Sequence, residues 1–386
     1  MSSASRYGIL TEADHPTAIV VGAGVFGAST ALALIRRGWR ITLLEKASAG
    51  HDGASSGGET RLWRSSHGGN RTYTRLAWAA REGWRQLEAE TGRKVLVETG
   101  LVWFAREQHT WETGSEEAAH ELGIPLERLT LDQVAGLFPS LRTDDLRFGL
   151  WEPNGGILRA RTAVRTLVDL AGRHGAVVRE GVMARPDGAA VRVGGQTLHA
   201  DRVVWACGPW LQRLFDGLDV TVTQQDTCFF SVGPQWHADR VPAWADFGGA
   251  AYGTGDLDGH GFKCASDVQG PPFDPDRDDR VPLPRHLDAA RQLLAHRFPA
   301  LAGAPLAGAR TCQYTTTRDT EFILSPTDDE RVWIVGGGSG HGFKHGPALG
   351  AYVADLLAGI SSPDPRFGLG PRASSGSLRT AGHEAR

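Results

Sequence analysis

Residues 17–45 read TAIVVGAGVFGASTALALIRRGWRITLLE. The apolar run that ends at Gly22 predicts a strand buried on both faces, as in a parallel sheet. Small and apolar residues then recur at helical spacing as far as Gly38, which suits the C-terminal end of a helix. A second apolar run, ITLLE, predicts another buried strand. Together these features predict a βαβ unit, the building block of nucleotide-binding halves.

The turn between the first strand and the helix fits the pattern G-x-G-x-x-G. Gly22 permits the tight turn, Gly24 lets backbone approach a pyrophosphate, and Gly27 allows close packing of helix against strand. Val25 and Phe26 stand between these glycines, where the free N–H groups and the dipole of a helix N-terminus favour an anion. The loop therefore predicts binding of a dinucleotide through its phosphates.

An acidic residue, Glu45, ends the second strand of this unit. In dinucleotide-binding folds an acid at this position binds the ribose hydroxyls. Strand, glycine loop, helix and acid thus occur in the expected order. At this level the residues leave FAD and NAD equally open.

The composition excludes several classes of protein. With 41% hydrophobic and 22% charged residues over 386 positions, the chain is of ordinary globular type and long enough for two or three domains. A formal charge of −3 provides no basic field for nucleic acid or an anionic membrane. The 50 glycines show no Gly-X-Y period, which excludes collagen and indicates tight turns and close approach of backbone to a ligand.

The spacing of the cysteines and histidines predicts neither disulfides nor a metal site. The cysteines are Cys207, Cys228, Cys264 and Cys312. They form no CxxC pair and are not spaced as zinc ligands, which favours a reducing compartment. The histidines are too scattered along the chain to predict a metal site.

Strands of the parallel type are expected in segments far apart in the sequence, with segments that look antiparallel between them. The parallel strands are expected near 17–22, 41–45, 202–207 and 331–336. This pattern predicts an α/β protein whose Rossmann-like nucleotide-binding domain is interleaved with a smaller α+β substrate domain built on a mixed or antiparallel sheet. The nucleotide-binding domain is expected at 17–92, 151–218 and 306–360, and the substrate domain at 93–150 and 219–305.

The two ends of the chain are expected to lie outside these domains. Residues 1–16 are polar and resemble a flexible leader, not a signal peptide. Residues 361–386 are rich in Ser, Gly, Pro and Arg, which predicts an extended or disordered tail. No stretch approaches the roughly 20 apolar residues that span a bilayer, so we expect a cytoplasmic protein.

Three further segments carry a family resemblance. They are SSGGETRLWRSSHGG at 55–69, VVWACGPW at 203–210, and TCQYTTTRDTEFIL at 311–324 followed by VGGGSGHGFKHGPALG at 335–350. With the βαβ unit, they make the chain resemble the monomeric sarcosine oxidase and N-methyltryptophan oxidase family, within the glycine/D-amino-acid oxidase class of flavoproteins. The resemblance covers about 17–360, and its motifs occur in the family's order and approximate spacing.

The resemblance implies that the dinucleotide is FAD, with its ring at the interface between the two domains. The further cofactor-binding residues that it implies are Lys46, Ser55, Thr60, Arg61, Val182, Gly208, Gly340, His341, Gly342, Phe343 and Lys344. Cys312 matches the cysteine that joins the flavin C8 methyl through a thioether. The residues themselves agree with this picture, because the backbone N–H groups clustered where SGHGF leads into the last helix would stabilise negative charge on a reduced flavin.

The resemblance also implies catalytic and substrate-binding residues. Lys263 matches the lysine beside flavin N5 that helps to activate oxygen, where a fixed cation lowers the barrier to the first electron transfer onto O₂. Arg64 and Lys344 match the pair that holds the substrate carboxylate. Tyr252 matches an active-site tyrosine that contacts substrate, and Arg61 is implied in catalysis beside the flavin.

The sequence departs from the sarcosine oxidases at three positions. Asp267 replaces a histidine shortly after Lys263, Gly57 replaces a second histidine, and His67 replaces a tyrosine. The acid at 267 is a candidate catalytic residue that could hold a cationic group of the substrate or take up a proton; the alternative is a turn residue that faces solvent. These departures put sarcosine itself in doubt as the substrate and leave the redox chemistry unchanged.

The resemblance implies an FAD-dependent amine oxidase that acts on a secondary, N-alkyl or cyclic, amino acid. The product would be an imine, and O₂ would be reduced to H₂O₂. Two alternatives stay open: a biosynthetic desaturase of a cyclic imino acid, and a flavin dehydrogenase that uses another electron acceptor. The expected partners are a small amino acid and O₂, without nucleic acid or membrane, and the chain is expected to be a monomer.

Overall fold

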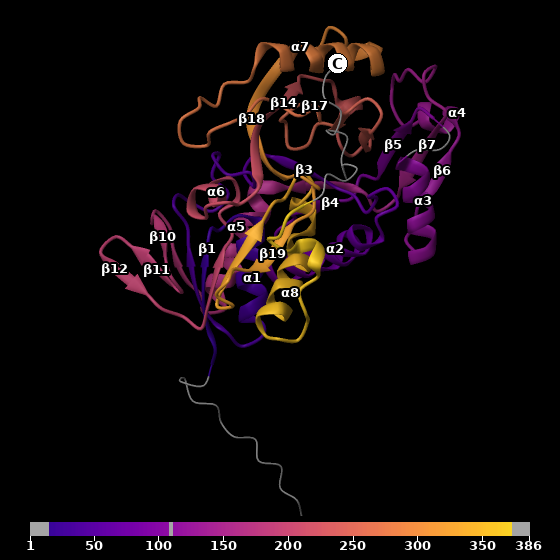
Figure 1. The fold of residues 1–386 in the computed structure, drawn as a ribbon. Helices are drawn as coiled ribbons and strands as arrows, with labels where there is room; N and C mark the ends of the chain where they lie inside the picture. The colour runs from indigo at the N-terminus through magenta and orange to yellow at the C-terminus, as the bar shows by residue number, and fades with distance from the viewer. Residues whose placement is uncertain (1–14, 108–110, 373–386) are drawn as a thin grey trace, which may run out of the picture.

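The computed structural model describes residues 15–107 and 111–372. The leader predicted at 1–16 therefore lies outside the described residues except for its last two positions. Figure 1 shows two layered units, with β1, α1 and α8 in the lower part of the view and β14, β17, β18 and α7 in the upper part. Each unit is built around its own sheet.

The first unit contains a six-stranded sheet in the order β19-β20-β13-β1-β2-β9. Its strands are β1 (Thr17–Val21), β2 (Arg40–Leu44), β9 (Val177–Arg179), β13 (Arg202–Trp205), β19 (Ile323–Pro326) and β20 (Val332–Gly336). All neighbours pair in parallel except β19, which pairs antiparallel with β20 at one edge. The four parallel strands expected from the sequence thus lie side by side, and the predicted Rossmann-like fold is confirmed.

Four long helices pack with this sheet. They are α1 (Val25–Ile35), α2 (Arg71–Thr91), α5 (Ala160–Arg173) and α8 (Gly346–Leu357). Helix α1 contacts both α5 and α8, and it is buried almost all round because its residues are small or apolar. Gly350 permits the close approach of α8, since a Cβ there would lie 2.4 Å from the backbone carbon of Ser29.

The second unit is a mixed eight-stranded sheet in the order β18-β14-β17-β16-β15-β5-β7-β6. Its strands are β5 (Leu101–Ala105), β6 (Glu127–Leu129), β7 (Phe148–Glu152), β14 (Val220–Phe230), β15 (Ala243–Asp246), β16 (Ala251–Thr254), β17 (Phe262–Ser266) and β18 (Leu306–Thr317). Only β15 and β5 pair in parallel among these neighbours. Helix α7 (Pro284–Arg297) packs on β14 and β17 over an aromatic core that includes Trp244, Phe262 and Phe298.

The long strand β18 lies in a different unit from the one predicted. The sequence assigned 306–360 to the nucleotide-binding domain, but β18 pairs antiparallel with β14 from Leu306 to Thr317. Its residues alternate in burial, as expected of a strand in an antiparallel pair. The chain therefore returns to the first sheet only after Thr317, at β19.

Two small sheets and several short helices complete the fold. The sheet β3-β8-β4 contains β3 (Thr60–Trp63), β4 (Leu96–Val97) and β8 (Gly156–Arg159), and the sheet β10-β11-β12 contains β10 (Ala184–Asp187), β11 (Ala190–Val193) and β12 (Gln196–Leu198). The remaining helices are α3 (Trp111–Leu122), α4 (Leu131–Ala135), α6 (Leu211–Leu214), η2 (Gly208–Trp210), η3 (Pro234–Trp236), η4 (Pro299–Leu301), η5 (Phe343–His345) and η6 (Pro365–Phe367). No helix of the described residues is long and apolar enough to cross a membrane.

The predicted tail differs from expectation over residues 361–372. Phe367 is buried and lies edge-on to Tyr73 and Tyr352. Arg372 donates to the Asp319 carboxylate at 2.8 Å and to the Gly368 carbonyl at 2.6 Å. These contacts of Phe367 and Arg372 hold the segment against the first unit. The composition of the segment did not predict this order, because only two of its residues provide the contacts. Residues 373–386 lie outside the described residues.

Candidate active site

A cavity of about 580 Å³ lies between the two sheets. On one side its wall is formed at the carboxyl ends of β1, β13 and β20, where open α/β sheets bind their ligands. On the other side it is formed by β14, β16, β17 and β18 of the second sheet. The cavity therefore joins the nucleotide-binding loop to the second unit.

The glycine loop closes tightly against the sheet. Gly22 has φ +98°, and a Cβ there would lie 2.5 Å from the carbonyl oxygen of Ala206. A Cβ on Gly27 would lie 1.9 Å from the carbonyl oxygen of Gly22. Gly22, Gly24, Val25 and Phe26 line the cavity, whereas Gly27 is outside its wall and serves the packing of α1 against β1.

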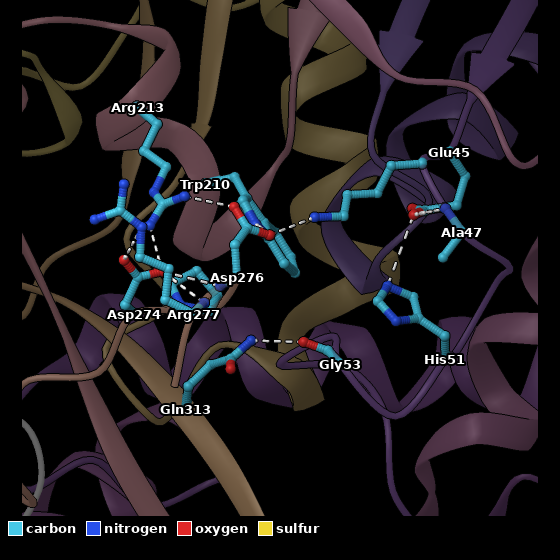
Figure 2. A network of polar contacts seen from close by, with 12 residues as sticks. Glu45, Ala47, His51, Gly53, Trp210, Arg213, Asp274, Asp276, Arg277 and Gln313 are labelled. Atoms are coloured by element: carbon cyan, nitrogen blue, oxygen red, sulfur yellow. Dashed lines mark hydrogen bonds and ion pairs between the residues drawn. The ribbon is translucent and has the colours of Figure 1, made fainter. Parts of the chain in front are cut away.

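The Glu45 carboxylate is buried beside this loop. Its Oε2 accepts from the Ala23 N–H at 2.8 Å. Its Oε1 accepts from the Ala47 N–H at 3.0 Å and lies 3.7 Å from His51 Nε2 (Figure 2). A carboxylate oxygen can accept more than one hydrogen bond, so both oxygens can still accept from a hydroxyl group. Val182 donates its backbone N–H to the Glu45 carbonyl at 2.9 Å, which brings it to the same end of the cavity.

A polar network connects the two units at this end of the cavity (Figure 2). Asp276, in the segment between β17 and α7, accepts from Lys46 Nζ at 2.9 Å and from Trp210 Nε1 at 2.8 Å. Arg213 forms ion pairs with Asp276 and with Asp274. The Lys46 ammonium also lies 3.8 Å from the centre of the Trp210 ring. Lys46, Trp210 and Asp276 all line the cavity, so the network closes part of its edge.

Arg61 holds the segment that follows the βαβ unit around Cys312. Its Nη2 donates to the carbonyls of Ser55 at 2.9 Å and Gly57 at 2.8 Å, and it lies 3.5 Å from the Cys312 sulfur. Its Nη1 donates to the Thr60 carbonyl at 2.8 Å. A fixed guanidinium beside a sulfur stabilises negative charge there. Cys312 is free and partly exposed to the cavity.

Lys263 is buried in β17 with its amine directed to β3. Nζ lies 3.3 Å from the Thr60 carbonyl oxygen, which can accept from it, and 5.2 Å from the centre of the Tyr252 ring. Burial, together with the positive charge of Arg61, lowers the pKa of Lys263 to about 7. The fixed cation expected at this position is therefore only partly charged at neutral pH.

Arg64 and Lys344 lie together at the end of the cavity away from Glu45. The Arg64 guanidinium lies 5.2 Å from the Trp103 ring centre and 5.5 Å from that of Trp111, and it donates to the Ser66 carbonyl. The Lys344 amine donates to the His341 carbonyl at 2.8 Å. Burial and the charge of Arg64 hold the pKa of Lys344 well below its usual value. An anion in the cavity would offset both charges.

A buried carboxylate, Glu152, organises this end of the cavity and was not anticipated from the sequence. It accepts from the Ser65 N–H at 2.6 Å, from Ser65 Oγ at 2.7 Å and from Trp103 Nε1 at 2.8 Å. It is only 1% exposed. Glu152 thus fixes both the turn that follows Arg64 and the indole against which Arg64 packs.

Tyr252, Tyr314 and Asp267 form a hydrogen-bonded chain on the wall of the second sheet. The two hydroxyls are 3.3 Å apart, and the Tyr314 hydroxyl donates to Asp267 Oδ1 at 3.5 Å. Burial, with the nearby charge of Asp267, raises the pKa of Tyr252 to about 12, so its hydroxyl stays protonated at neutral pH. Asp267 is half-buried and lines the cavity.

The structure brings almost every site residue predicted from the sequence to this one cavity. Gly27 is the exception, for the packing reason given above. The wall also contains residues that were not predicted, among them Ser56, Trp103, Trp210, Gln225, Thr227, Phe247, Gln313 and Tyr314. Ser56, Trp210, Gln313 and Tyr314 lie in the same motifs as predicted residues and could have been found there. The others stand on strands or in loops with no motif of their own.

The cavity wall fits an extended dinucleotide. Helix α1 begins at the cavity with no acidic residue in its first turn, so the positive end of its dipole faces an incoming phosphate unopposed by its own side chains. Gly208 has φ +52°, and a Cβ there would meet no protein atom within 4 Å, which leaves the cavity open beside β13. Glu45 of the first unit and Cys312 of the second unit both line the cavity, so one extended ligand could contact both units.

Comparison with known proteins places these observations in context. The family described as DAO, FAD dependent oxidoreductase, matches residues 17–356. A monomeric sarcosine oxidase of Streptomyces avermitilis is 32% identical over 372 residues, which is 92% of this chain and 96% of that protein. An N-methyl-L-tryptophan oxidase of Yersinia pestis is 26% identical over 361 residues, which is 89% of this chain and 95% of that protein.

Solved structures show the same fold. NikD, an unusual amino acid oxidase essential for nikkomycin biosynthesis, has a TM-score of 0.77 at 25% identity, and the match covers 92% of this chain and 97% of NikD. An L-proline dehydrogenase from P. horikoshii has a TM-score of 0.82 at 19% identity over 92% of this chain and 97% of that one. At 19% identity the likeness concerns the fold alone.

Proposed function

The chain belongs to the DAO family of FAD-dependent oxidoreductases, in the sarcosine oxidase and amino acid oxidase class, and from this premise we propose that it oxidises an amino acid with a secondary amine. The proposed substrate carries an N-alkyl or cyclic amine, and the product is an imine. The amine loses a hydride and a proton, and O₂ takes up two electrons and two protons as H₂O₂. The pair of cationic side chains at one end of the cavity, Arg64 and Lys344, carries this proposal.

The two cations suit a carboxylate. Arg64 presents a planar fork of N–H donors, and Lys344 adds a buried amine that an adjacent carboxylate would favour in its charged form. Glu152 opposes their charge but is occupied with Ser65 and Trp103. A substrate carboxylate would therefore gain two charge-assisted hydrogen bonds, and it would fix which carbon of the substrate faces the rest of the cavity.

The amine end of the substrate is assigned to the chain of Tyr252, Tyr314 and Asp267. A hydride leaves the carbon beside nitrogen easily only when the nitrogen is neutral and its lone pair can assist. Asp267 accepts from Tyr314, so its carboxylate can take the proton that the amine gives up, directly or through the hydroxyls.

The residues that would hold FAD follow from the wall of the cavity. The glycine loop and the start of α1 would bind the pyrophosphate, and Glu45 would bind the ribose. FAD bound there supplies the acceptor for the hydride. We assign Cys312 as the point of covalent attachment, because its sulfur faces the cavity beside the Arg61 guanidinium. Lys263 is assigned to oxygen activation.

The direct test uses purified protein mixed anaerobically with a panel of N-methyl, cyclic and diamino acids, with the flavin absorbance followed near 450 nm. The proposal expects bleaching by at least one secondary amino acid and about one H₂O₂ per turnover on admission of air. Two rounds of oxidation on a cyclic substrate would instead identify the desaturase, and bleaching without H₂O₂ would identify a dehydrogenase with another acceptor. A flavin inert to the whole panel would contradict the proposal.

The carboxylate assignment has its own test. Lys344→Met should lower kcat/KM for the best amino acid about 10- to 100-fold, since one hydrogen bond between charged groups is lost. The same change should have little effect on the corresponding amine without a carboxylate. Lys94→Met, at a lysine whose side chain is 78% exposed, is the matched control. Equal losses on both substrates would show that Lys344 does not bind the carboxylate.

We further propose that the enzyme acts as a monomer in the cytoplasm. The four cysteines are all free in the structure, as a reducing compartment would keep them. Size-exclusion chromatography with light scattering should give a mass near 41.4 kDa. A dimer mass at micromolar concentration would overturn the monomer.

A further inference from the structure

Three buried histidines from two motifs meet beside the cavity, whose wall includes His341. His67 lies in the turn after β3, and His341 and His345 lie in the segment between β20 and α8. One ring nitrogen of each lies within 4.8 Å of those of the other two. Their exposed fractions are 1%, 4% and 0%. The sequence predicted no metal site, because His67 and His341 are 274 positions apart (341 − 67) and only the fold brings them together.

Two of the rings are oriented by backbone carbonyls. His67 Nδ1 lies 2.8 Å from the Ser65 carbonyl oxygen, and His341 Nε2 lies 3.0 Å from that of Thr320. A carbonyl can only accept, so each of these nitrogens carries the hydrogen and donates it. In a neutral ring the lone pair then belongs to the other nitrogen, Nε2 of His67 and Nδ1 of His341. Metal-bound histidines are fixed in this way by their outer contacts.

The third ring, that of His345, has no hydrogen-bond partner of its own among the described residues. Neither nitrogen of His345 has a hydrogen-bond partner among the described residues, and neither does Nε2 of His67. Both rings are nine-tenths or more buried, where an unsatisfied polar atom is unfavourable. Aromatic side chains surround the rings, with Tyr73 and Phe322 within 5.6 Å of His345 centre to centre.

The spacing suits one small cation. Ring centres are 5.0 Å apart for His67 and His345, 5.8 Å for His67 and His341, and 6.0 Å for His341 and His345. A tetrahedral zinc ion with Zn–N bonds of about 2.0–2.1 Å needs nitrogens about 3.4 Å apart. Each ring would have to move inward by less than about 1 Å to reach that geometry.

We propose that His67, His341 and His345 bind a divalent transition-metal ion of the zinc type. A set of three imidazoles without an oxygen ligand disfavours Mg²⁺ and Ca²⁺ and suits Zn²⁺, Ni²⁺ or Cu²⁺. The bound ion must tolerate the positive charges of Arg64 and Lys344, and the buried carboxylate of Glu152 opposes those charges.

The ion would position the proposed carboxylate clamp. Arg64 stands just before His67 in one segment, and Lys344 directly precedes His345 in the other. A metal held by both segments would fix the two cations relative to each other. Because the three rings are buried, we expect the ion to be taken up as the chain folds and not exchanged afterwards.

The test measures metal in the FAD-loaded enzyme expressed with added Zn²⁺ and dialysed without chelator. Mass spectrometry for Zn, Cu, Ni, Co, Fe and Mn should find about one equivalent per chain in the wild type. His67→Phe and His345→Phe keep a ring in the cluster and should retain less than about a tenth of that amount. His174→Phe, at an exposed histidine, should retain it in full. Absence of metal from the wild type, or equal metal in the cluster variants, would overturn the proposal.

A second measurement does not depend on the variants folding. Anomalous scattering at the zinc edge from wild-type crystals should give a peak between the three rings. No peak there, or an ordered water in its place, would show that the nitrogens are satisfied without a metal. Flavin absorbance recorded on the same samples reports on the cofactor site separately, so failure of the metal proposal would leave the proposed function untouched.

Discussion

Burial gives Lys263 two opposing properties. It removes water, which strengthens the effect of an ammonium group on charge developing nearby, and it also makes the ammonium form itself costly. With the charge of Arg61 added, the pKa of Lys263 falls to about 7. The lysine is therefore protonated in most molecules below pH 7 and neutral in most molecules above it.

This balance predicts how reoxidation depends on pH. If the ammonium form assists O₂, the rate constant of flavin reoxidation should fall as pH rises through about 7, and Lys263→Met should lower it on the order of 100-fold at pH 6. Stopped-flow mixing of reduced enzyme with O₂ measures the rate. Lys94→Met should match the wild type at every pH, and a pH-independent wild type would remove Lys263 from this role.

Cys312 differs from the other cysteines in its surroundings. Burial raises the pKa of Cys228 to about 11, and burial also raises the pKa of the Cys264 thiol, which suits small inert core residues. Cys312 instead lies beside Arg61 in the cavity wall. FAD attached through a stable sulfur–carbon bond would stay with the chain when the protein unfolds, whereas FAD bound without a covalent bond would be released.

Acid precipitation therefore distinguishes the cysteines. Wild-type protein and Cys207→Ser should keep the yellow colour in the pellet, because Cys207 lines the same cavity but is not assigned to attachment. Cys312→Ser should release the flavin to the supernatant, where its absorbance is measured. Colour that stays with precipitated Cys312→Ser would assign the attachment elsewhere.

At the scale of elements, the join between β1 and α1 depends on one close contact. A Cβ on Gly27 would meet the Gly22 carbonyl at 1.9 Å, so the helix could not start where it does. In α5, by contrast, a Cβ on Gly172 would meet only the Val178 side chain, at 3.9 Å. The helix start therefore requires glycine at position 27, whereas position 172 has room for a larger residue.

The two substitutions to alanine should therefore change stability in opposite directions. Gly27→Ala should lower the free energy of unfolding by about 1–3 kcal/mol or more through overpacking, and it should weaken retention of FAD in a Cys312→Ser background. Gly172→Ala should raise it by up to about 1 kcal/mol, because alanine is the better helix former. Denaturant unfolding measures both. Equal changes in the free energy of unfolding for the two variants would mean that the contact between Gly27 and the Gly22 carbonyl does not require glycine.

At the scale of the whole molecule, the two units are joined around the cavity by polar contacts as well as by the chain. Asp276 receives hydrogen bonds from Lys46 and Trp210 and pairs with Arg213, all from the first unit. The Asp276 side chain is 38% exposed, so solvent screens each pair and the contribution of each is small, about 0.2–1 kcal/mol. The network matters more for keeping the edge of the cavity closed than for total stability.

Opening of this edge should be visible in the exchange of FAD. In the Cys312→Ser background, Asp276→Asn should speed release of FAD several-fold while the melting temperature falls by only a few degrees, as expected for the loss of exposed ion pairs. Asp279→Asn, an exposed acid in the same segment, is the control. Flavin fluorescence follows the release. Unchanged release with a large loss of stability would mean that the network holds the fold and not the edge.

The amino-acid sequence by itself determined the βαβ unit, the glycine loop and the motifs that line the cavity. These features are local: a buried strand, a helix and a turn of glycines each follow from residues a few positions apart, so spacing alone is enough to predict them. The family resemblance then supplied Arg64, Lys263 and Lys344, which the fold brings to one cavity.

The tertiary structure decided what depends on contacts between distant segments. The place of strand β18 in the second sheet was not predicted, because its partner β14 lies about ninety residues earlier in the chain. Strand pairing across such a distance has no local sequence signal. The burial of Glu152 beside Ser65 and the meeting of His67 with His345 have the same origin. Charge, tautomer and pKa at the site depend on these neighbours, which only the folded chain brings together.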